Sequence, residues 1–463
     1  MTKPYQYQIT GTKFLVDKQR CILADDMGLG KTKMALDALQ QVNARRTLII
    51  CPKTAISVWA NSDENNPGEI EKWLGWDYTI VDGDNRVAKA QYPTRITIIS
   101  YSMFIGRGTP NYVLDVMCKQ PWDVIIFDEA HKLKNRKTKT FKSAKRLRHA
   151  VPFKYIFCVS ATPVLNRPEE LWPLLHMIDP KQYSSFWGWV DKYCTTKPAW
   201  YNKRAIEIIG IARPQQLKAD AGPLILRRMK EDVWEDMPEK TYQDITVDLL
   251  PPQRKVYDQM KQEMYTMLKN GEIVDAINTL ALGIRLKQIA VSPDMLDVKS
   301  TELTGAKFDV LDDIIAGTDQ KIVVFSQFSR AITRLYAKYG KTATILYGET
   351  TDVERKAAIT RFQTDPNTQL FLTTTQSGGQ SITLTAGTIA VFLDLLWTPK
   401  LNDQAADRIH RRGQTKPVTI INLVAKDTIE SYIQKVLDSK NAMFDSIIPT
   451  VSAKTVRNYF GVC

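Results

Sequence analysis

Short apolar runs alternate with helical patterns through roughly the first third of the chain. The runs are rich in Ile and Val and carry no charged residue, as expected for strands buried on both faces of a sheet. Helical patterns between such strands predict a parallel α/β sheet. The predicted strands are Cys21–Ala24, Thr47–Cys51, Ile96–Ser100, Val124–Phe127 and Tyr155–Ser160.

A second alternating series begins near residue 305 and predicts a second parallel sheet. Between the two series, residues 165–300 hold frequent tryptophans and helical patterns without clear buried strands. We therefore expect an N-terminal lobe over residues 1–164, helical insertions and a linker over 165–300, and a C-terminal lobe over 301–463. The strands of the second lobe are expected at Ile322–Phe325, Thr344–Tyr347, Leu370–Thr374, Ala390–Leu395 and Val418–Val424.

The loop after the first predicted strand has the composition of a phosphate-binding loop. Met27–Gly30 is a tight glycine loop, and Lys31 and Thr32 open a helix with apolar residues at helical spacing. Glycines let backbone N–H groups surround an anion, and the helix N-terminus adds its positive dipole end. In this context Lys31 reaches the β- and γ-phosphates and Thr32 ligates Mg²⁺. Ala24 replaces the usual first glycine, and a small residue still fits there.

Two carboxylates, Asp128 and Glu129, follow the buried run Val124–Phe127. Asp128 can hold Mg²⁺ through its water shell, and Glu129 can orient and deprotonate an attacking water. A simpler interpretation is an acidic strand end that caps the next helix. In a chain that also has a phosphate loop, the catalytic interpretation is favoured.

A basic segment in the second lobe is the candidate counterpart of these carboxylates. Arg408 and Arg411 lie three positions apart, so on a helix they would share a face. Two guanidiniums facing a transferring phosphoryl group are worth roughly 10³–10⁵ in rate, or about 4–7 kcal/mol. Taken alone, the segment is better described as a solvated basic helix.

The charge of the chain favours an anionic partner, nucleic acid first, because the net charge is +13. From Lys132 to Arg148 there are nine Lys or Arg residues and no acid. This segment could lie along a phosphate backbone or be an exposed basic helix without a partner. Both interpretations remain open.

The six cysteines are scattered without a C-x-x-C pair, which indicates reduced residues of an intracellular protein. No run approaches the length of a membrane span, and the N-terminus lacks an apolar signal core. We therefore expect a soluble protein that is not secreted, in the cytoplasm of a bacterial or virus-infected cell, or in the nucleus of a eukaryote.

Together these motifs resemble the Swi/Snf (sucrose-non-fermenting) class of superfamily II helicase-like ATPases, over most of the chain. Ser160–Pro163 matches the coupling motif of that class, and its Mg²⁺ motif is of the DEAH-box type. Asp26, Ala161 and Thr398 replace its more usual Glu, Gly and Asn. The other matching segments are Tyr7-Gln8, Asp25–Thr32, Asp128–Asn135, Leu226–Val233, Met237–Lys240, Phe325–Phe328, Trp397–Pro399 and His410–Gln414.

The resemblance implies two RecA-like lobes that use ATP and Mg²⁺ to move along double-stranded DNA, acting as a monomeric motor to which a protein partner could supply targeting. It implies metal binding by Thr32 and Asp128, and catalysis by Lys31, Asp128, Glu129, Arg408 and Arg411. The implied nucleotide-binding residues are Gln8, Asp26, Met27, Gly28, Leu29, Gly30, Lys31, Thr32, Arg408 and Arg411. The implied DNA contacts are Thr54, Ser100, Lys134, Thr162, Thr373 and Trp397.

Two alternatives remain open. One is a superfamily II helicase that separates strands. The other is a nucleotide-switched DNA clamp that hardly turns over, against which the intact Glu129 and Arg411 argue.

Overall fold

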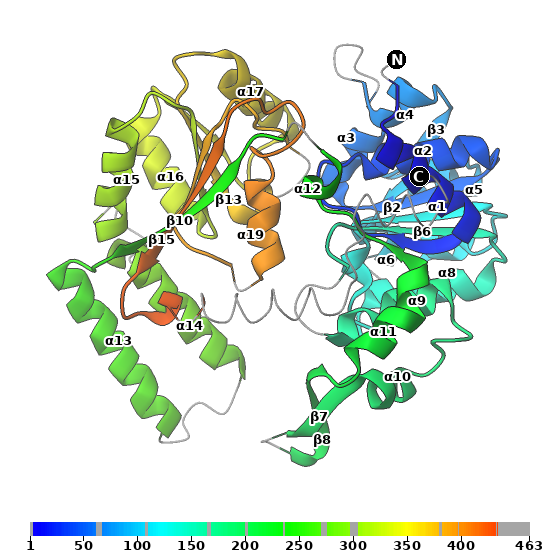
Figure 1. Ribbon diagram of the computed structural model, residues 1–463, viewed down its shortest axis with the longest axis horizontal. Coiled ribbons are helices and arrows are strands. Elements are labelled where there is room, and N and C mark those ends of the chain that lie inside the picture. Colours follow the sequence, from blue (N-terminus) through cyan, green and yellow to red (C-terminus); the bar gives the residue numbers. More distant parts are fainter. Residues whose placement is uncertain are drawn as a thin grey trace. The chain divides into compact units, whose positions relative to one another are not determined.

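The computed structural model divides the chain into two compact units, one up to residue 235 and one from residue 236 to 440 (Figure 1). Each unit is described by itself below. The structure describes residues 3–61, 67–106, 110–163, 168–199, 202–234, 237–269, 276–296, 304–378, 382–396, 398–431 and 433.

The first unit is built on a seven-stranded sheet in which every strand pair is parallel, in the order β3-β4-β2-β5-β6-β1-β9. Five strands match the predicted ones closely, so the predicted parallel α/β sheet is confirmed. The strands are β1 (Arg20–Leu23), β2 (Thr47–Cys51), β3 (Tyr78–Val81), β4 (Ile96–Ser100), β5 (Val124–Asp128), β6 (Tyr155–Val159) and β9 (Ile225–Leu226).

Helices cover both faces of this sheet, which explains why its central strands are apolar throughout. Figure 1 shows helices on both sides of this sheet. One face packs against α1 (Gln6–Lys18), α2 (Lys31–Gln41), α3 (Ile56–Trp59) and α4 (Glu69–Trp73). The other packs against α5 (Arg86–Gln91), α6 (Tyr101–Ile105), α7 (Tyr112–Met117), α8 (Lys139–Ala150) and α9 (Trp172–Ile178).

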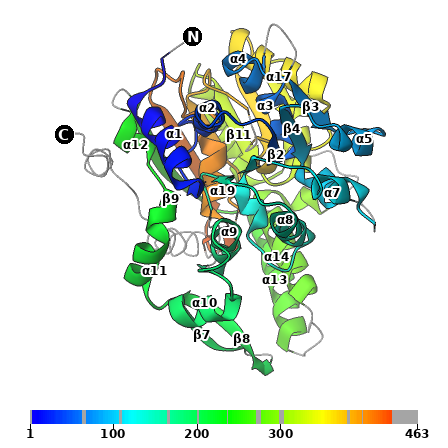
Figure 2. The same ribbon diagram turned by 90° about the vertical axis from the view of Figure 1, so that its right-hand side faces the viewer.

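The rest of the first unit combines short helices with an antiparallel hairpin. Trp172 and Trp189 are buried in its core, whereas Trp187 is exposed. The hairpin lies next to α10 in both views (Figures 1 and 2). The helices and strands are α10 (Phe186–Tyr193), β7 (Cys194–Ala199), β8 (Asn202–Ile211), α11 (Pro214–Ala221) and α12 (Lys230–Val233).

The structure also describes five short 3₁₀ helices in the two units. They are η1 (Lys53–Ala55), η2 (Ala130–Leu133), η3 (Pro168–Glu170), η4 (Gly222–Leu224) and η5 (Pro293–Met295).

The second unit has a six-stranded sheet, again parallel at every pair, in the order β10-β15-β14-β11-β13-β12. This confirms the predicted second α/β sheet. Its strands are β10 (Lys240–Val247), β11 (Ile322–Ser326), β12 (Ala343–Leu346), β13 (Leu370–Thr374), β14 (Ile389–Phe392) and β15 (Val418–Ala425).

Helices also cover both faces of this second sheet. One face packs against α15 (Ala306–Ala316) and α16 (Ser329–Tyr339), and the other against α17 (Asp352–Thr364) and α19 (Pro399–Ala406). α18 (Thr375–Gly378) follows β13 directly. α13 (Pro251–Lys269) and α14 (Ala276–Val291) form a smaller separate core around Tyr257.

The segment 165–300 differs from the helical insertion expected from the sequence. It contains the hairpin β7–β8 and two strands that extend the large sheets, since β9 pairs with β1 and β10 pairs with β15. β9 has only two residues, and β10 is an edge strand with a mostly exposed face. Neither therefore has the continuous apolar run of a central parallel strand.

Candidate active site

The loop between β1 and α2 has the backbone of a phosphate-binding loop. Gly28 and Gly30 have φ angles of 81° and 78°, a conformation that favours glycine. Gly30 is also the N-cap residue of α2. A Cβ atom added at Gly30 would lie 2.5 Å from Nε2 of Gln8, so the loop packs closely on α1. The free N–H groups at the start of α2 are suited to an anion.

Lys31 is held over this loop by backbone carbonyl groups. Its Nζ donates to the carbonyl oxygens of Asp25 at 2.9 Å and Asp26 at 3.0 Å. Burial lowers the pKa of Lys31, while Glu129 and three aspartates, Asp25, Asp26 and Asp128, act in the opposite direction. The ammonium group therefore lies among carboxylates, as a phosphate-binding cation next to a metal site does.

Gln8 is buried beside the same loop. Its Nε2 donates to the carbonyl oxygen of Leu29 at 3.4 Å, and its Oε1 accepts from the backbone N–H of Tyr5 at 3.1 Å. Within the loop, the N–H of Met27 donates to Asp26 at 2.9 Å. The structure therefore brings Gln8, predicted to bind the nucleotide, to the predicted phosphate loop.

Asp128 ends β5 and is fixed by two hydrogen bonds. The indole N–H of Trp59 donates to one carboxylate oxygen at 2.8 Å, and the backbone N–H of Glu129 donates to the other at 3.0 Å. Burial and the neighbouring Glu129 raise the pKa of Asp128 to about 7, against the two hydrogen bonds and Lys31. Trp59 is wholly buried, and no pattern in the sequence marks its contact with this carboxylate.

An oxygen donor set of Asp128 and Thr32 is chemically suited to Mg²⁺, which prefers few protein ligands together with water and phosphate oxygens. Among the described residues no group of three or more His, Cys, Asp or Glu side chains could hold a metal ion alone. A metal at this position would therefore share its ligands with a nucleotide.

Glu129 connects the predicted metal site to the end of β6. Its backbone has a φ of 49°, an uncommon value for a residue other than glycine. His131 Nδ1 lies 3.2 Å from a carboxylate oxygen of Glu129 and 3.2 Å from Oγ of Ser160. Oγ of Ser160 in turn accepts from the backbone N–H of Thr162 at 3.3 Å. The predicted water-activating carboxylate and the coupling motif are thus neighbours.

The arginine segment of the second unit differs from its prediction. α19 ends at Ala406, and Arg408 and Arg411 lie in the turns that follow, so the argument that they share a helix face is wrong. Arg408 is buried, and Nη1 of Arg411 donates to the carbonyl oxygen of Ile382 at 3.0 Å. The backbone N–H of Arg408 donates to the carbonyl oxygen of Ala405 at 3.1 Å, which indicates a tightened turn here.

Residues from the start of β10 hold this segment in place. Nζ of Lys240 lies 3.5 Å from the carboxylate of Asp407, and Nε2 of His410 lies 2.8 Å from the carbonyl oxygen of Pro238. Gln414 donates to the carbonyl oxygen of Gly387 at 2.8 Å. The Met237–Lys240 motif, to which the sequence assigned no role, therefore packs against both sides of Arg408.

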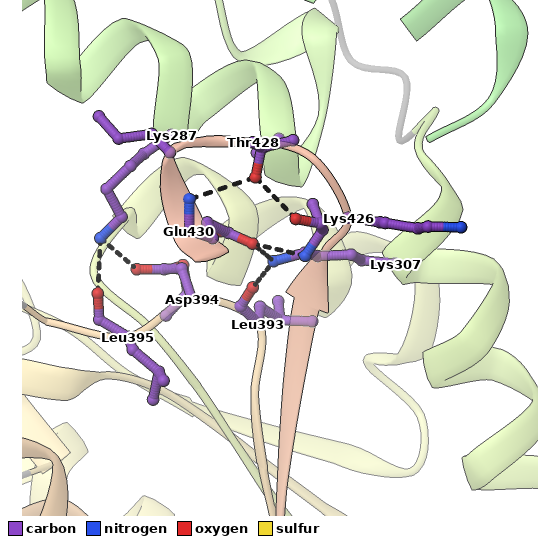
Figure 3. A network of polar contacts seen from close by, with 12 residues as sticks. Lys287, Lys307, Leu393, Asp394, Leu395, Lys426, Thr428 and Glu430 are labelled. Atoms are coloured by element: carbon purple, nitrogen blue, oxygen red, sulfur yellow. Dashed lines mark hydrogen bonds and ion pairs between the residues drawn. The ribbon is translucent and has the colours of Figure 1, made fainter. Parts of the chain in front are cut away.

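A network of buried ion pairs lies at the carboxyl ends of β14 and β15 (Figure 3). Nζ of Lys287 donates to the carbonyl oxygen of Leu395 at 2.7 Å and lies 3.6 Å from Asp394. Nζ of Lys307 lies 2.6 Å from Glu430, whose carboxylate also accepts from the backbone N–H of Ala425. Both lysines are wholly buried, so these pairs fix the loop after β14 and the chain after β15.

The predicted DNA-contact residues lie in varied surroundings. Ser100, Thr162 and Thr373 are buried at or just beyond strand ends, and Ser100 caps α6. Lys134 lies 3.2 Å from Glu170. Thr54 lies in η1, and Trp397 lies outside the described residues.

The basic run from Lys132 to Arg148 is partly engaged with the protein itself. Arg146 forms an ion pair with Asp115 at 2.7 Å, and Nε of Arg148 donates to the carbonyl oxygen of Met177 at 3.2 Å. Lys132, Lys137, Lys139 and Lys142 are exposed. The run therefore combines contacts within the protein with an exposed positive surface.

A parallel α/β unit with a phosphate loop and an acidic strand end, followed by a second such unit with an arginine segment, defines a helicase-like ATPase core. Residues 7–295 match the SNF2-related domain, and residues 306–413 match the helicase conserved C-terminal domain. The chain therefore belongs to the SNF2-related family of helicase-like ATPases.

Several curated relatives align with nearly the whole chain. It is 28% identical over 96% of its length to SWI/SNF-related matrix-associated actin-dependent regulator of chromatin subfamily A member 1 of Homo sapiens. It is 26% identical over 94% of its length to DNA annealing helicase and endonuclease ZRANB3 of Bos taurus. It is 26% identical over 95% to an uncharacterized ATP-dependent helicase of Mycoplasma genitalium. The chain spans only 43%, 39% and 41% of these relatives.

Among solved structures, the Sulfolobus solfataricus SWI2/SNF2 ATPase core in complex with dsDNA is 25% identical, with a TM-score of 0.44, covering 98% of this chain and 96% of that one.

Of the helices that the structure describes, none is both long and apolar enough to cross a membrane. All five described cysteines are free, as expected from their spacing.

Proposed function

We propose that the chain is an ATP-driven motor that moves along double-stranded DNA without separating its strands. The observation that carries the proposal is the grouping, in one unit, of the glycine loop, Lys31 and the fixed carboxylate of Asp128. Membership in the SNF2-related family supports the choice of ATP as the nucleotide.

In this proposal Gln8 and residues 26–32 bind the nucleotide, and Lys31 holds its phosphates. Thr32 and Asp128 hold Mg²⁺, which when bound neutralises charge on the phosphate oxygens. Glu129 orients the attacking water and takes its proton. Arg408 and Arg411 stabilise the charge that develops on the transferring phosphoryl group.

We further propose that the motor contacts the phosphate backbone rather than the bases. The net charge of +13 supports an anionic partner, and curated relatives carry DNA in their printed names. The proposed contacts are Thr54, Ser100, Lys134, Thr162, Thr373 and Trp397. A monomeric motor that receives its targeting from a protein partner is part of the same proposal.

Two other functions are separable from this one. A strand-separating helicase needs an element that splits the duplex, and the second unit has only parallel strand pairs among its described residues. A nucleotide-switched clamp would need no water-activating group, and Glu129 is fixed beside His131. These observations favour the translocating motor.

The test compares two substrates under the same ATP conditions. A translocating motor displaces the third strand of a triplex, whereas a forked duplex stays paired. Fork unwinding without triplex displacement would instead establish a helicase. ATP hydrolysis that no nucleic acid stimulates, together with tight nucleotide-dependent DNA binding, would establish a clamp.

A further inference from the structure

Arg228 is a wholly buried arginine that the nucleotide-binding roles above do not include. It lies two residues beyond β9, in the segment that leads along the chain from the first unit to the second. Its Nε donates to one carboxylate oxygen of Asp25 at 3.0 Å, and its Nη2 donates to the other. Asp25 is also wholly buried and directly precedes the phosphate loop. The pair is thus bidentate, although the two residues are 203 positions apart.

The same guanidinium reaches two helices that flank the loop. Nη1 donates to the carbonyl oxygen of Tyr7 and to Oγ1 of Thr10 at 3.0 Å, both on α1. Nη2 lies 3.5 Å from Sδ of Met34 on α2. All three nitrogen atoms of the Arg228 side chain therefore make contacts. An arginine side chain has five N–H donors in a fixed geometry, which suits it to bind several acceptors at once. A lysine, with three donors and no planar fork, could not make them all.

The backbone around Arg228 is bonded to the loop as well. The N–H of Ala24 donates to the carbonyl oxygen of Leu226 at 2.7 Å, and the N–H of Asp26 donates to that of Arg228 at 2.9 Å. The pairing of β1 with β9 therefore continues into the start of the phosphate loop. Asp26 is consequently fixed by Arg228, and its own carbonyl oxygen accepts from Lys31 at 3.0 Å.

Gly11 makes room for this arrangement inside α1. A Cβ atom at this position would lie 2.7 Å from Nη2 of Arg228 and 2.3 Å from Sδ of Met34. Glycine within a helix costs about 1 kcal/mol relative to alanine. The glycine therefore leaves space beside α1 for both the guanidinium and the Met34 side chain.

We infer that Arg228 is a positioning residue for the phosphate loop, and that it acts through Asp25 and the carbonyl groups that hold Lys31. The inference deepens the proposed function and rests on it for the identity of the nucleotide. It makes nucleotide affinity depend on the segment that joins the two units. An ion pair that contributes only to folding would leave the affinity of the folded protein unchanged.

The test measures the Kd of a fluorescent ATP analogue with Mg²⁺, together with the thermal unfolding midpoint, for the full chain. Arg228→Lys keeps the charge but loses the fork, and we expect its Kd to rise by about tenfold or more, because small misplacements of a binding loop are costly. At saturating ATP its kcat should change less than its KM.

Lys307→Met is the matched control. Lys307 is also a wholly buried cation, paired with Glu430 in the second unit (Figure 3). We expect Lys307→Met to lower the unfolding midpoint. Its Kd for the ATP analogue should stay within about twofold of the Kd of the unsubstituted protein, because the ion pair of Lys307 and the phosphate loop belong to different units and are independent. If Arg228→Lys does not fold, Gly11→Ala takes its place with the same expected rise in Kd, because its Cβ would crowd the guanidinium and Sδ of Met34 without removing a charge.

The outcomes separate the inference from the proposal on which it rests. An unchanged Kd in folded Arg228→Lys, or an equal rise in Lys307→Met, overturns the positioning role. Lys31→Ala is measured in parallel, since its loss of binding depends only on the proposed nucleotide site. If Lys31→Ala binds the analogue normally, the site itself is wrong and the proposed function fails with it.

Discussion

Lys31 opens α2 directly after the glycine loop, and Glu129 directly follows β5, so their side chains serve the site more than the core. We predict that Lys31→Ala abolishes ATP turnover while the protein stays folded, because the phosphates lose their cation. Glu129→Gln should still bind ATP but hydrolyse it at least about 10²-fold more slowly, since only the water-activating carboxylate changes. Steady-state turnover and nucleotide binding, measured side by side, check both variants. Near-normal turnover in either would contradict the assignment.

Asp128 gives the nucleotide-free protein a pH-dependent stability. Burial and Glu129 raise the pKa of Asp128 to about 7 in the folded state. Because this carboxyl group has a higher pKa in the folded protein than in the unfolded chain, its stabilising contribution is complete below the pKa of the unfolded chain. The contribution is lost as the pH rises through the pKa of the folded protein. Between about pH 6 and about pH 8 the free energy of unfolding therefore falls by about 1.4 kcal/mol. We therefore predict a lower unfolding midpoint at the higher pH, by roughly 3–6 °C.

The matched variant isolates this carboxyl group from other titrating groups. Asp128→Asn has no charge to lose, so the difference between the two pH values should shrink in melts recorded with a metal chelator. Adding Mg²⁺ and ATP should restore the original protein at the higher pH, because the carboxylate then has cations beside it. An equal pH dependence in both proteins would argue against the raised pKa of Asp128.

At this scale the sequence predicts groups that belong to local motifs and misses those fixed by distant contacts. Lys31 and Asp128 each follow a recognisable strand, and both lie where expected. Trp59 donates to Asp128 from 69 positions away, and Arg228 reaches Asp25 from 203. No local pattern marks either contact, because the sheet order that brings them together is a property of the whole unit.

The same distinction holds for the elements. Central strands such as β5 and β11 are buried on both faces, and their continuous apolar runs made them predictable. The strands β3, β9 and β10 lie at or beside sheet edges, with fewer apolar residues or only two residues in all. Edge strands need only one apolar face, so they resemble loops or linkers in the sequence.

β10 has a further role, because its first residue is bonded to the arginine segment. Burial alone would lower the pKa of Lys240, but Asp407 and Tyr242 raise it above its ordinary value, so the ion pair with Asp407 is retained. We predict that Lys240→Met lowers kcat about tenfold with little change in ATP affinity, because the turn carrying Arg408 loses its support. The measurement is steady-state kinetics over a range of ATP concentrations.

Lys338→Met is the matched control for this prediction. Lys338 is paired with Asp312 on α15, in the same unit but with both side chains partly exposed. It should change neither kcat nor KM, since exposed pairs contribute little. Equal losses in the two variants would show that the arginine segment is not specifically supported by β10.

At the scale of the whole molecule, two parallel sheets and a net charge of +13 are combined in a chain that spans about two fifths of its curated relatives. A motor that grips phosphates needs no access to bases, and phosphate contacts carry no sequence information. The core should therefore respond to DNA as a charged duplex.

We predict that duplex DNA raises the ATPase rate strongly and independently of its sequence, and that RNA does so much less. The half-saturating duplex concentration should rise steeply with salt, because each phosphate neutralised contributes about −0.9 to the slope of log K against log salt.

Replacing the exposed residues Lys137 and Lys142 together by Gln should reduce that slope by about two if both contact phosphates. The measurement is the ATPase rate against duplex, single-stranded DNA and RNA at several salt concentrations. A slope unchanged in the double variant would assign the basic run to packing and solubility alone. Equal stimulation by RNA and duplex would contradict the duplex-tracking motor.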